Sequence, residues 1–167
     1  MPFMLADGEE LYQSGALLHW AGQMGDSSLY PAATDPTLCR KIEEMLGVAD
    51  DLQRAWTPAL YIGMGRHTSY GYPKEWPDKD ATVKALRERF VAEELPKYMA
   101  FVTDALSSSG GFICGPKPTI ADCQLIPQLI YYTRGVADYV PKDCLDKYPA
   151  VTAYIARFKA LLPEHYA

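Results

Sequence analysis

The sequence has no run of basic residues and no apolar run long enough to span a membrane. A protein that follows a phosphate backbone needs clustered lysine and arginine, and a spanning helix needs about 20 consecutive apolar residues. The net charge of −5 also disfavours contact with nucleic acid. The N-terminus, MPFMLADGEEL, lacks the basic start and apolar block of a secretory signal. We therefore expect a cytoplasmic protein with neither a nucleic-acid nor a membrane partner.

Metal-ligand patterns are absent from the sequence as well. None of the four cysteines belongs to a CxxC pair, and none of the three histidines stands at ligand spacing from another. A metal site is therefore not expected. Cys39 and Cys123 fall within helical patterns, where a buried free thiol is the simplest interpretation.

The chain opens with a short ββα pattern. Residues 3–6 are apolar, Asp7-Gly8 is a hairpin turn signal, and residues 10–12 alternate polar and apolar side chains. Ser14 can then cap a helix that we expect to end at Gly25. A two-stranded sheet is marginal in water, so we interpret the hairpin as the end of a larger sheet.

Helical spacing dominates the rest of the chain. A long apolar pattern begins after Asp35-Pro36, a good helix start, and contains Pro58, where we expect a kink or a break. A loop rich in glycine, proline and aromatic residues is expected next. The periodic segments that follow it cover residues 80–106, 119–135 and 148–162.

The segment that begins at Thr119 is expected to be the central core helix. Thr119 can cap it, and Asp122, three residues later, can reach back to the backbone N–H of Thr119 in a capping box. The side chains behind this cap are almost all apolar, which is typical of a buried helix. Pro127 lies inside this helix, so a kink or a missing hydrogen bond is expected near Cys123. The predicted fold is mainly α, with about five helices after the ββα opening.

The order of these pieces resembles the soluble glutathione transferases. MPFMLADGEELYQSGALLHWAG is similar to the end of that family's thioredoxin-like domain, and GPKPTIADCQL to its capping box and core helix. CLDKYPAVTAYIARFKALLP resembles the closing helix, and VADDLQ the first helix of the all-α domain in the tyrosine-type classes, nearest to pi and sigma. The resemblance implies a partial thioredoxin-like domain over residues 1–26 and an all-α C-terminal domain over 31–167.

The resemblance also implies the co-substrate. Gln13 and Ser14 match the family's helix start, which holds the γ-glutamyl end of glutathione; the alternative is a plain N-cap. Met1-Pro2 matches the cis-proline turn that pairs with the cysteinyl part. Asp51 matches an aspartate that reaches glutathione in the other subunit of a homodimer, although Asp50 leaves the register open and both can be solvated surface charges.

The resemblance places a hydrophobic substrate site at the end of the first long helix. Tyr61 and Trp56 match that site; core packing is the alternative, which we favour for Trp56. The family's preceding strand–helix–strand, which carries the thiolate-stabilising residue, has no counterpart in this sequence, so no catalytic residue is assigned. Two functions are considered: conjugation of glutathione to hydrophobic electrophiles, a detoxification reaction, and a non-catalytic module that binds ligands or proteins.

Overall fold

A hairpin and a short helix are joined to a bundle of long helices. The structure, a computed structural model, describes residues 3–166. The elements are β1 (Phe3–Ala6), β2 (Glu9–Tyr12), α1 (Ser14–Gly22), α2 (Pro36–Gly63), the 3₁₀-helix η1 (His67–Tyr70), α3 (Lys79–Arg89), the π-helix η2 (Phe90–Glu94), α4 (Leu95–Ser109), α5 (Ile120–Thr133), α6 (Pro149–Leu161) and α7 (Pro163–Tyr166). The mainly α fold with a small N-terminal sheet is as predicted. None of the helices among these residues is both long and apolar enough to cross a membrane.

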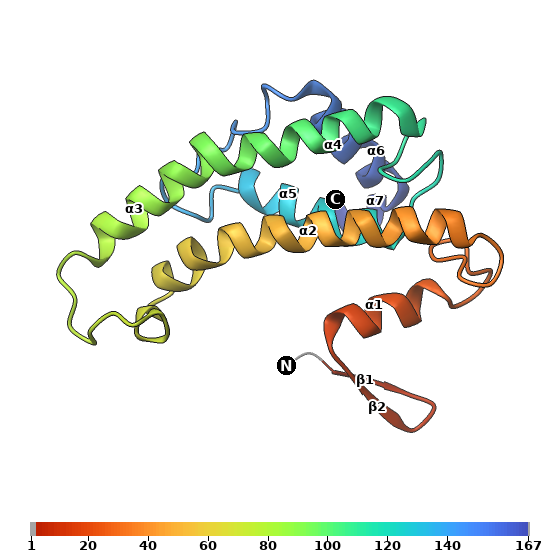
Figure 1. Cartoon of the computed structure of the whole chain (residues 1–167), viewed down its shortest axis with the longest axis horizontal. Coiled ribbons are helices and arrows are strands. Elements are labelled where there is room, and N and C mark those ends of the chain that lie inside the picture. The colour runs from red at the N-terminus through yellow and green to blue at the C-terminus, as the bar shows by residue number, and fades with distance from the viewer. Residues whose placement is uncertain (1–2, 167) are drawn as a thin grey trace.

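The two strands pair antiparallel with Phe3 opposite Tyr12, and Asp7 and Gly8 turn between them at φ 52° and 85°. Positive φ at both turn residues is the geometry that an Asp-Gly hairpin favours. The hairpin is the whole sheet within the described residues. It packs on α1 and projects away from the helical bundle (Figure 1).

Two expectations about α1 were wrong. Ser14 is the first helical residue instead of the cap, because Gln13 occupies the cap position at φ 71° and no side chain caps the helix there. The helix also ends at Gly22 rather than Gly25. The linker to α2 includes residues 27–30, where the boundary between the two predicted domains falls.

Helix α2 and the α3–η2–α4 segment form two long arms that run side by side (Figure 1). Asp35 caps α2 through Leu38 N at 2.9 Å, as predicted. The break considered at Pro58 does not occur, since α2 continues to Gly63. The predicted helix over residues 80–106 contains one π turn, in which Leu95 N–H bonds to the carbonyl of Phe90, five residues back. A π turn of this kind lets the helix continue past Pro96, whose ring and missing N–H would otherwise disturb it.

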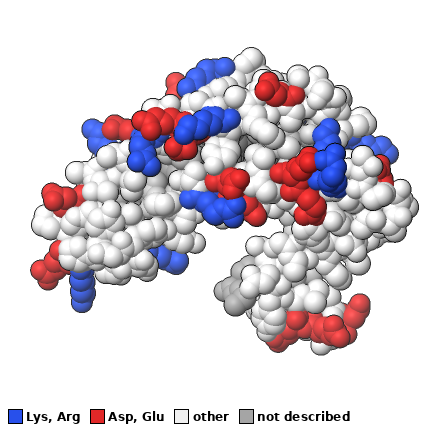
Figure 2. All heavy atoms as spheres, viewed as in Figure 1, with Lys and Arg blue, Asp and Glu red and all other residues white. Residues whose placement is uncertain are grey.

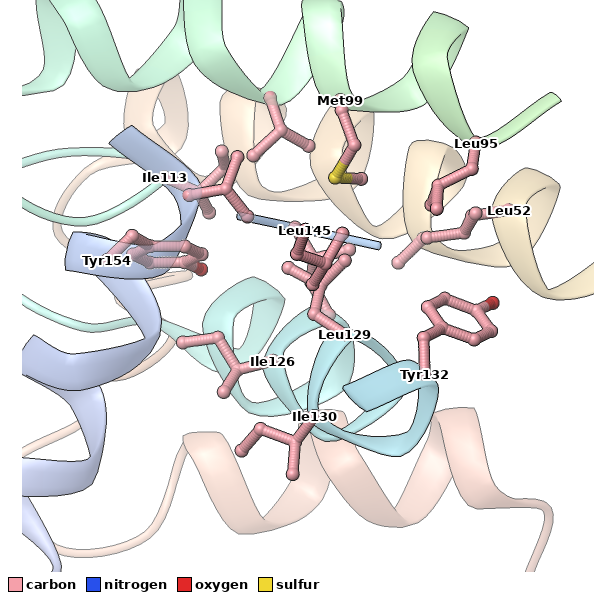
Figure 3. Packing of buried hydrophobic residues seen from close by; sticks show 14 of the residues in the cluster. Leu52, Leu95, Met99, Ile113, Ile126, Leu129, Ile130, Tyr132, Leu145 and Tyr154 are labelled. Carbon is pink, nitrogen blue, oxygen red and sulfur yellow. The ribbon is translucent and has the colours of Figure 1, made fainter. Parts of the chain in front are cut away.

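Helix α5 lies at the centre of the core, against α2 on one side and α6 on the other. Its apolar side chains pack against those of the two long arms and of the loop between α5 and α6. Figure 3 shows Leu129 beside Leu145, which belongs to this loop, and Tyr132 near Leu52 of α2. The helix runs through Pro127, which is exposed and therefore faces away from this packing. The predicted role of α5 as the core helix is confirmed.

The capping box is present and is wholly buried. Asp122 Oδ2 accepts hydrogen bonds from Thr119 N at 2.6 Å and Thr119 Oγ1 at 2.9 Å. Its Oδ1 accepts from Ile113 N at 2.9 Å and from the Tyr154 hydroxyl at 2.6 Å. One carboxylate therefore ties α5 to the preceding loop and to α6, and burial together with the Asp122 charge raises the pKa of Tyr154.

Candidate binding cleft

A cleft of about 830 Å³ lies between α1, α2 and α5. Figure 2 shows the molecule hollowed between the projecting hairpin with α1 and the helical bundle. Helix α2 supplies half of the lining from residues three or four apart, which share one face of a helix. The cleft thus lies where the N-terminal unit, which consists of β1, β2 and α1, meets the helical bundle. Its walls are partly apolar and partly polar.

One end of the cleft is aromatic. Trp56, Tyr61, Tyr131 and Tyr132 line it, with the Trp56 ring centroid 5.5 Å from that of Tyr132. Trp56 is only 4 % exposed, whereas Tyr61 is 37 % exposed at the mouth. The indole Nε1 of Trp56 and the side-chain Oε1 of Gln128 are buried without a hydrogen-bond partner among the described residues.

A three-residue polar cluster stands on the cleft wall where α1 meets α2. His19 Nε2 lies 2.8 Å from Glu43 Oε1, and its Nδ1 lies 2.7 Å from the carbonyl of Gly15. The Tyr30 hydroxyl donates to the same Glu43 oxygen at 2.8 Å. Because both ring nitrogens face acceptors, the arrangement favours the doubly protonated imidazolium.

The acid–base properties of the cluster follow from these bonds. Partial burial acts to lower the pKa of His19, but the bonds to Gly15 and Glu43 outweigh it and raise that pKa. Burial acts to raise the pKa of Glu43, but the bonds from His19 and Tyr30 lower it. The bond to Glu43 is also the main cause that raises the pKa of Tyr30 to about 12. At neutral pH, Glu43 is therefore ionised and Tyr30 keeps its proton.

Asp50 and Asp51, which the sequence left as alternatives, point in different directions. Asp50 lines the cleft and accepts a hydrogen bond from Gln124 Nε2 at 2.6 Å, which connects α2 to α5. Asp51 is exposed, does not line the cleft and is paired with Arg54. Of the two aspartates, Asp50 therefore lines the cleft, while Asp51 faces solvent.

Of the other predicted binding residues, some line the cleft and some do not. Ser14 lines the cleft beside Gly15, so the start of α1 opens into it. Gln13 is exposed and lies just outside the lining residues. Trp56 is both core and cleft wall, so the two interpretations of that residue are compatible. Met1 and Pro2 lie outside the described residues.

Sequence reasoning missed His19, Glu43 and Asp50 as neighbours in one site. Glu43 and Asp50 are seven residues apart, which places them on one face of a helix, and that signal was available. The position of His19 across from Glu43 depends on how the linker after α1 folds back, which no local pattern reveals.

The cysteines of this chain lie away from the cleft. The four cysteines are free thiols, and none of them lines the cleft. Burial raises the pKa of Cys114 to about 11, so that thiol stays protonated. Within residues 3–166, no group of three or more potential ligand side chains could hold a metal ion.

Comparison with protein families finds a match in the helical part of the chain. The model described as "Glutathione S-transferase, C-terminal domain" matches residues 67–162, which is more than half of the chain. The search of curated proteins found no match.

Proposed function

This chain belongs to the glutathione S-transferase family, and we propose that it binds glutathione beside the start of α1 and an apolar second ligand in the cleft. The observation that carries the proposal is the continuity of the cleft from Ser14 to the aromatic wall at Tyr61. Backbone N–H groups at a helix start favour carboxylates, and flat apolar molecules favour aromatic walls. Gln13, Ser14 and the Met1-Pro2 segment are the glutathione contacts of this proposal.

The reaction is attack of the glutathione thiolate on a hydrophobic electrophile. The thiolate is the nucleophile, so catalysis requires a group that stabilises its negative charge. We assign that role to none of these 167 residues. Trp56 and Tyr61 form the wall against which the electrophile lies. The alternative is a module that binds the same ligands without catalysis.

We propose that the partner of this chain is a second copy of itself, in a homodimer. Phe3, Leu5 and Tyr12 on the hairpin are 63, 66 and 47 % exposed, although they are large and apolar. Apolar surface of this kind marks interaction sites. Asp51 faces outward, as a residue must if it is to reach glutathione in another subunit. Sedimentation velocity is expected to show self-association that the double variant Phe3→Lys, Leu5→Lys weakens; a monomer at high concentration would contradict it.

Isothermal titration of the 167-residue chain with glutathione tests the binding proposal. We expect saturable binding that Ser14→Ala weakens about ten- to hundredfold, because one such hydrogen bond to a charged group is worth roughly 1.5–3 kcal/mol. The control is Ser108→Ala, an exposed serine of α4 that bonds only to its own helix and should leave the affinity unchanged. A titration in which the heat per injection shows no saturation with glutathione would contradict the proposal.

Conjugation to an activated aryl halide tests whether these 167 residues contain a catalytic group. Assayed as these 167 residues, the protein is expected to show the uncatalysed rate, because no thiolate-stabilising group is assigned among them. Turnover far above that rate would overturn this assignment and place a catalytic group within the chain.

A further inference from the structure

The charged groups of the cleft are unusual for a site expected to hold an anionic co-substrate nearby. Glu43 and Asp50 both line it, and among residues 3–166 no lysine or arginine does. Gly47 lies between the two carboxylates on the same face of α2, and a Cβ built there meets nothing within 4 Å. The cleft is therefore open between two negative charges.

These charges are only partly compensated from within the cleft. Glu43 bonds to His19, whose positive charge offsets it while the imidazole is protonated. Asp50 is bonded to the neutral amide of Gln124, which leaves its charge in place. The lining is thus net negative in either protonation state of His19, and it disfavours organic anions by repulsion.

The aromatic wall provides the other half of a cation site. Ring faces attract cations through their quadrupole, and the combination with nearby carboxylates recognises ammonium groups. The guanidinium carbon of Arg66 lies 5.1 Å from the Tyr61 centroid, so a ligand can use only the face of this ring that Arg66 leaves free. Gln128 lines the same cleft, and its side-chain Oε1 is a buried acceptor without a hydrogen-bond partner among the described residues.

We propose that the cleft selects organic cations: aromatic molecules that carry a protonated or quaternary amine. The apolar ring lies against Trp56 and Tyr61, and the ammonium group lies toward Asp50 and Glu43. This inference rests on the proposed function only in that both use the same cleft. It names the class of second ligand and excludes aromatic carboxylates and sulfonates of similar size.

The test compares two probes that share a ring and differ in charge, (2-naphthylmethyl)trimethylammonium and 2-naphthylacetate. Each is titrated calorimetrically into the full chain without glutathione, at low and at high salt. We expect the cation to bind at least about tenfold more tightly than the anion, with a preference that salt reduces. Equal or tighter binding of the anion would overturn the proposal.

Variants locate the preference within the cleft. Asp50→Asn and Glu43→Gln are each expected to weaken cation binding several-fold while they leave a neutral probe, 2-methylnaphthalene, unaffected. The matched control is Glu44→Gln, because Glu44 is the next residue of α2 but is exposed and paired with Arg40 outside the cleft. If Glu44→Gln weakens the cation as much as Glu43→Gln, bulk charge explains the effect and the site is rejected.

The outcome is distinguishable from failure of the proposed function. Cation binding without any glutathione binding supports this inference and removes the transferase assignment. Glutathione binding without cation preference does the reverse. If a variant loses both glutathione binding and cation binding, its thermal unfolding is measured, so that a folding defect is recognised.

Discussion

At the scale of single residues, Asp122 contributes most to the connection between elements. Its carboxylate is fully buried and accepts four hydrogen bonds from three residues: Ile113, Thr119 and Tyr154. A buried charge is tolerated only when it is hydrogen-bonded in this way, and removal of its partners leaves it uncompensated. The role of Asp122 is structural, because it does not line the cleft.

Asp122→Asn is expected to lower the free energy of unfolding by about 3 kcal/mol or more, since an amide nitrogen would then face N–H and O–H donors. Tyr154→Phe removes one of the four bonds and should cost about 1–3 kcal/mol. Urea denaturation of the two single variants and the double variant measures this, and the double variant should lose less than the sum. Asp104→Asn, on an exposed position of α4, is the control and should lie within about 0.5 kcal/mol of the parent. Simple additivity would contradict the shared network.

At the scale of elements, α2 is the helix that builds both the core and the cleft. Its buried side chains pack on α5 and α3, and its other face lines the cleft. The two glycines Gly22 and Gly47 show how differently the same residue serves these elements. A Cβ at Gly22 would collide with Ile120 Cγ2 and lie 3.0 Å from Tyr30 Cβ, so α1 approaches α5 closely only because that side chain is missing.

The glycines therefore predict opposite effects of one substitution. Gly47→Ala should stabilise the protein by about 0.5–1 kcal/mol, because alanine is the better helix former and the added methyl meets nothing. Gly22→Ala should destabilise it by roughly 1–3 kcal/mol through overpacking against Ile120. Thermal unfolding of both variants measures the difference. Two changes of the same sign would show that helix propensity alone decides, and that the α1–α5 contact is loose.

At the scale of the whole molecule, His19 and Glu43 hold the N-terminal unit against the bundle. The raised pKa of His19 means that the folded state favours its protonated form. This contribution is complete below the unfolded pKa of about 6.5 and is lost as the pH rises through the higher folded pKa. Glu43 has a lowered pKa, so its contribution is lost as the pH falls below about 4.5 and through that lower value.

The attachment of α1 to α2 is thus expected to be strongest between about pH 4.5 and 6.5. The difference in melting temperature between the parent and His19→Gln should be largest near pH 5.5 and should shrink toward pH 8.5. The effect will be modest, because the His19 side chain is 31 % exposed and solvent screens the pair. His165→Gln, in the exposed C-terminal segment, serves as the control. A difference that grows with pH would contradict the assignment.

The sequence by itself determined the local elements and their order. Asp7-Gly8, Asp35-Pro36 and the Thr119–Asp122 box depend on interactions between residues at most a few positions apart, so their signals are complete within short segments. The apolar spacing of α2 and α5 likewise predicted which helices form the core. The Ser14 cap was wrong because the positive φ of Gln13 moves the helix start by one residue, which no side-chain pattern signals.

Only the tertiary structure decided which residues line the cleft and which distant residues contact one another. The contacts of His19 with Glu43, Gln124 with Asp50, and Tyr154 with Asp122 join residues 24, 74 and 32 positions apart. Such contacts depend on how four helices, α1, α2, α5 and α6, pack and on the path of the linker after α1, and no sequence spacing encodes that path. The choice between Asp50 and Asp51 shows the reason most plainly. One residue along a helix is a turn of about 100°, and only packing fixes which of the two carboxylates faces the cleft.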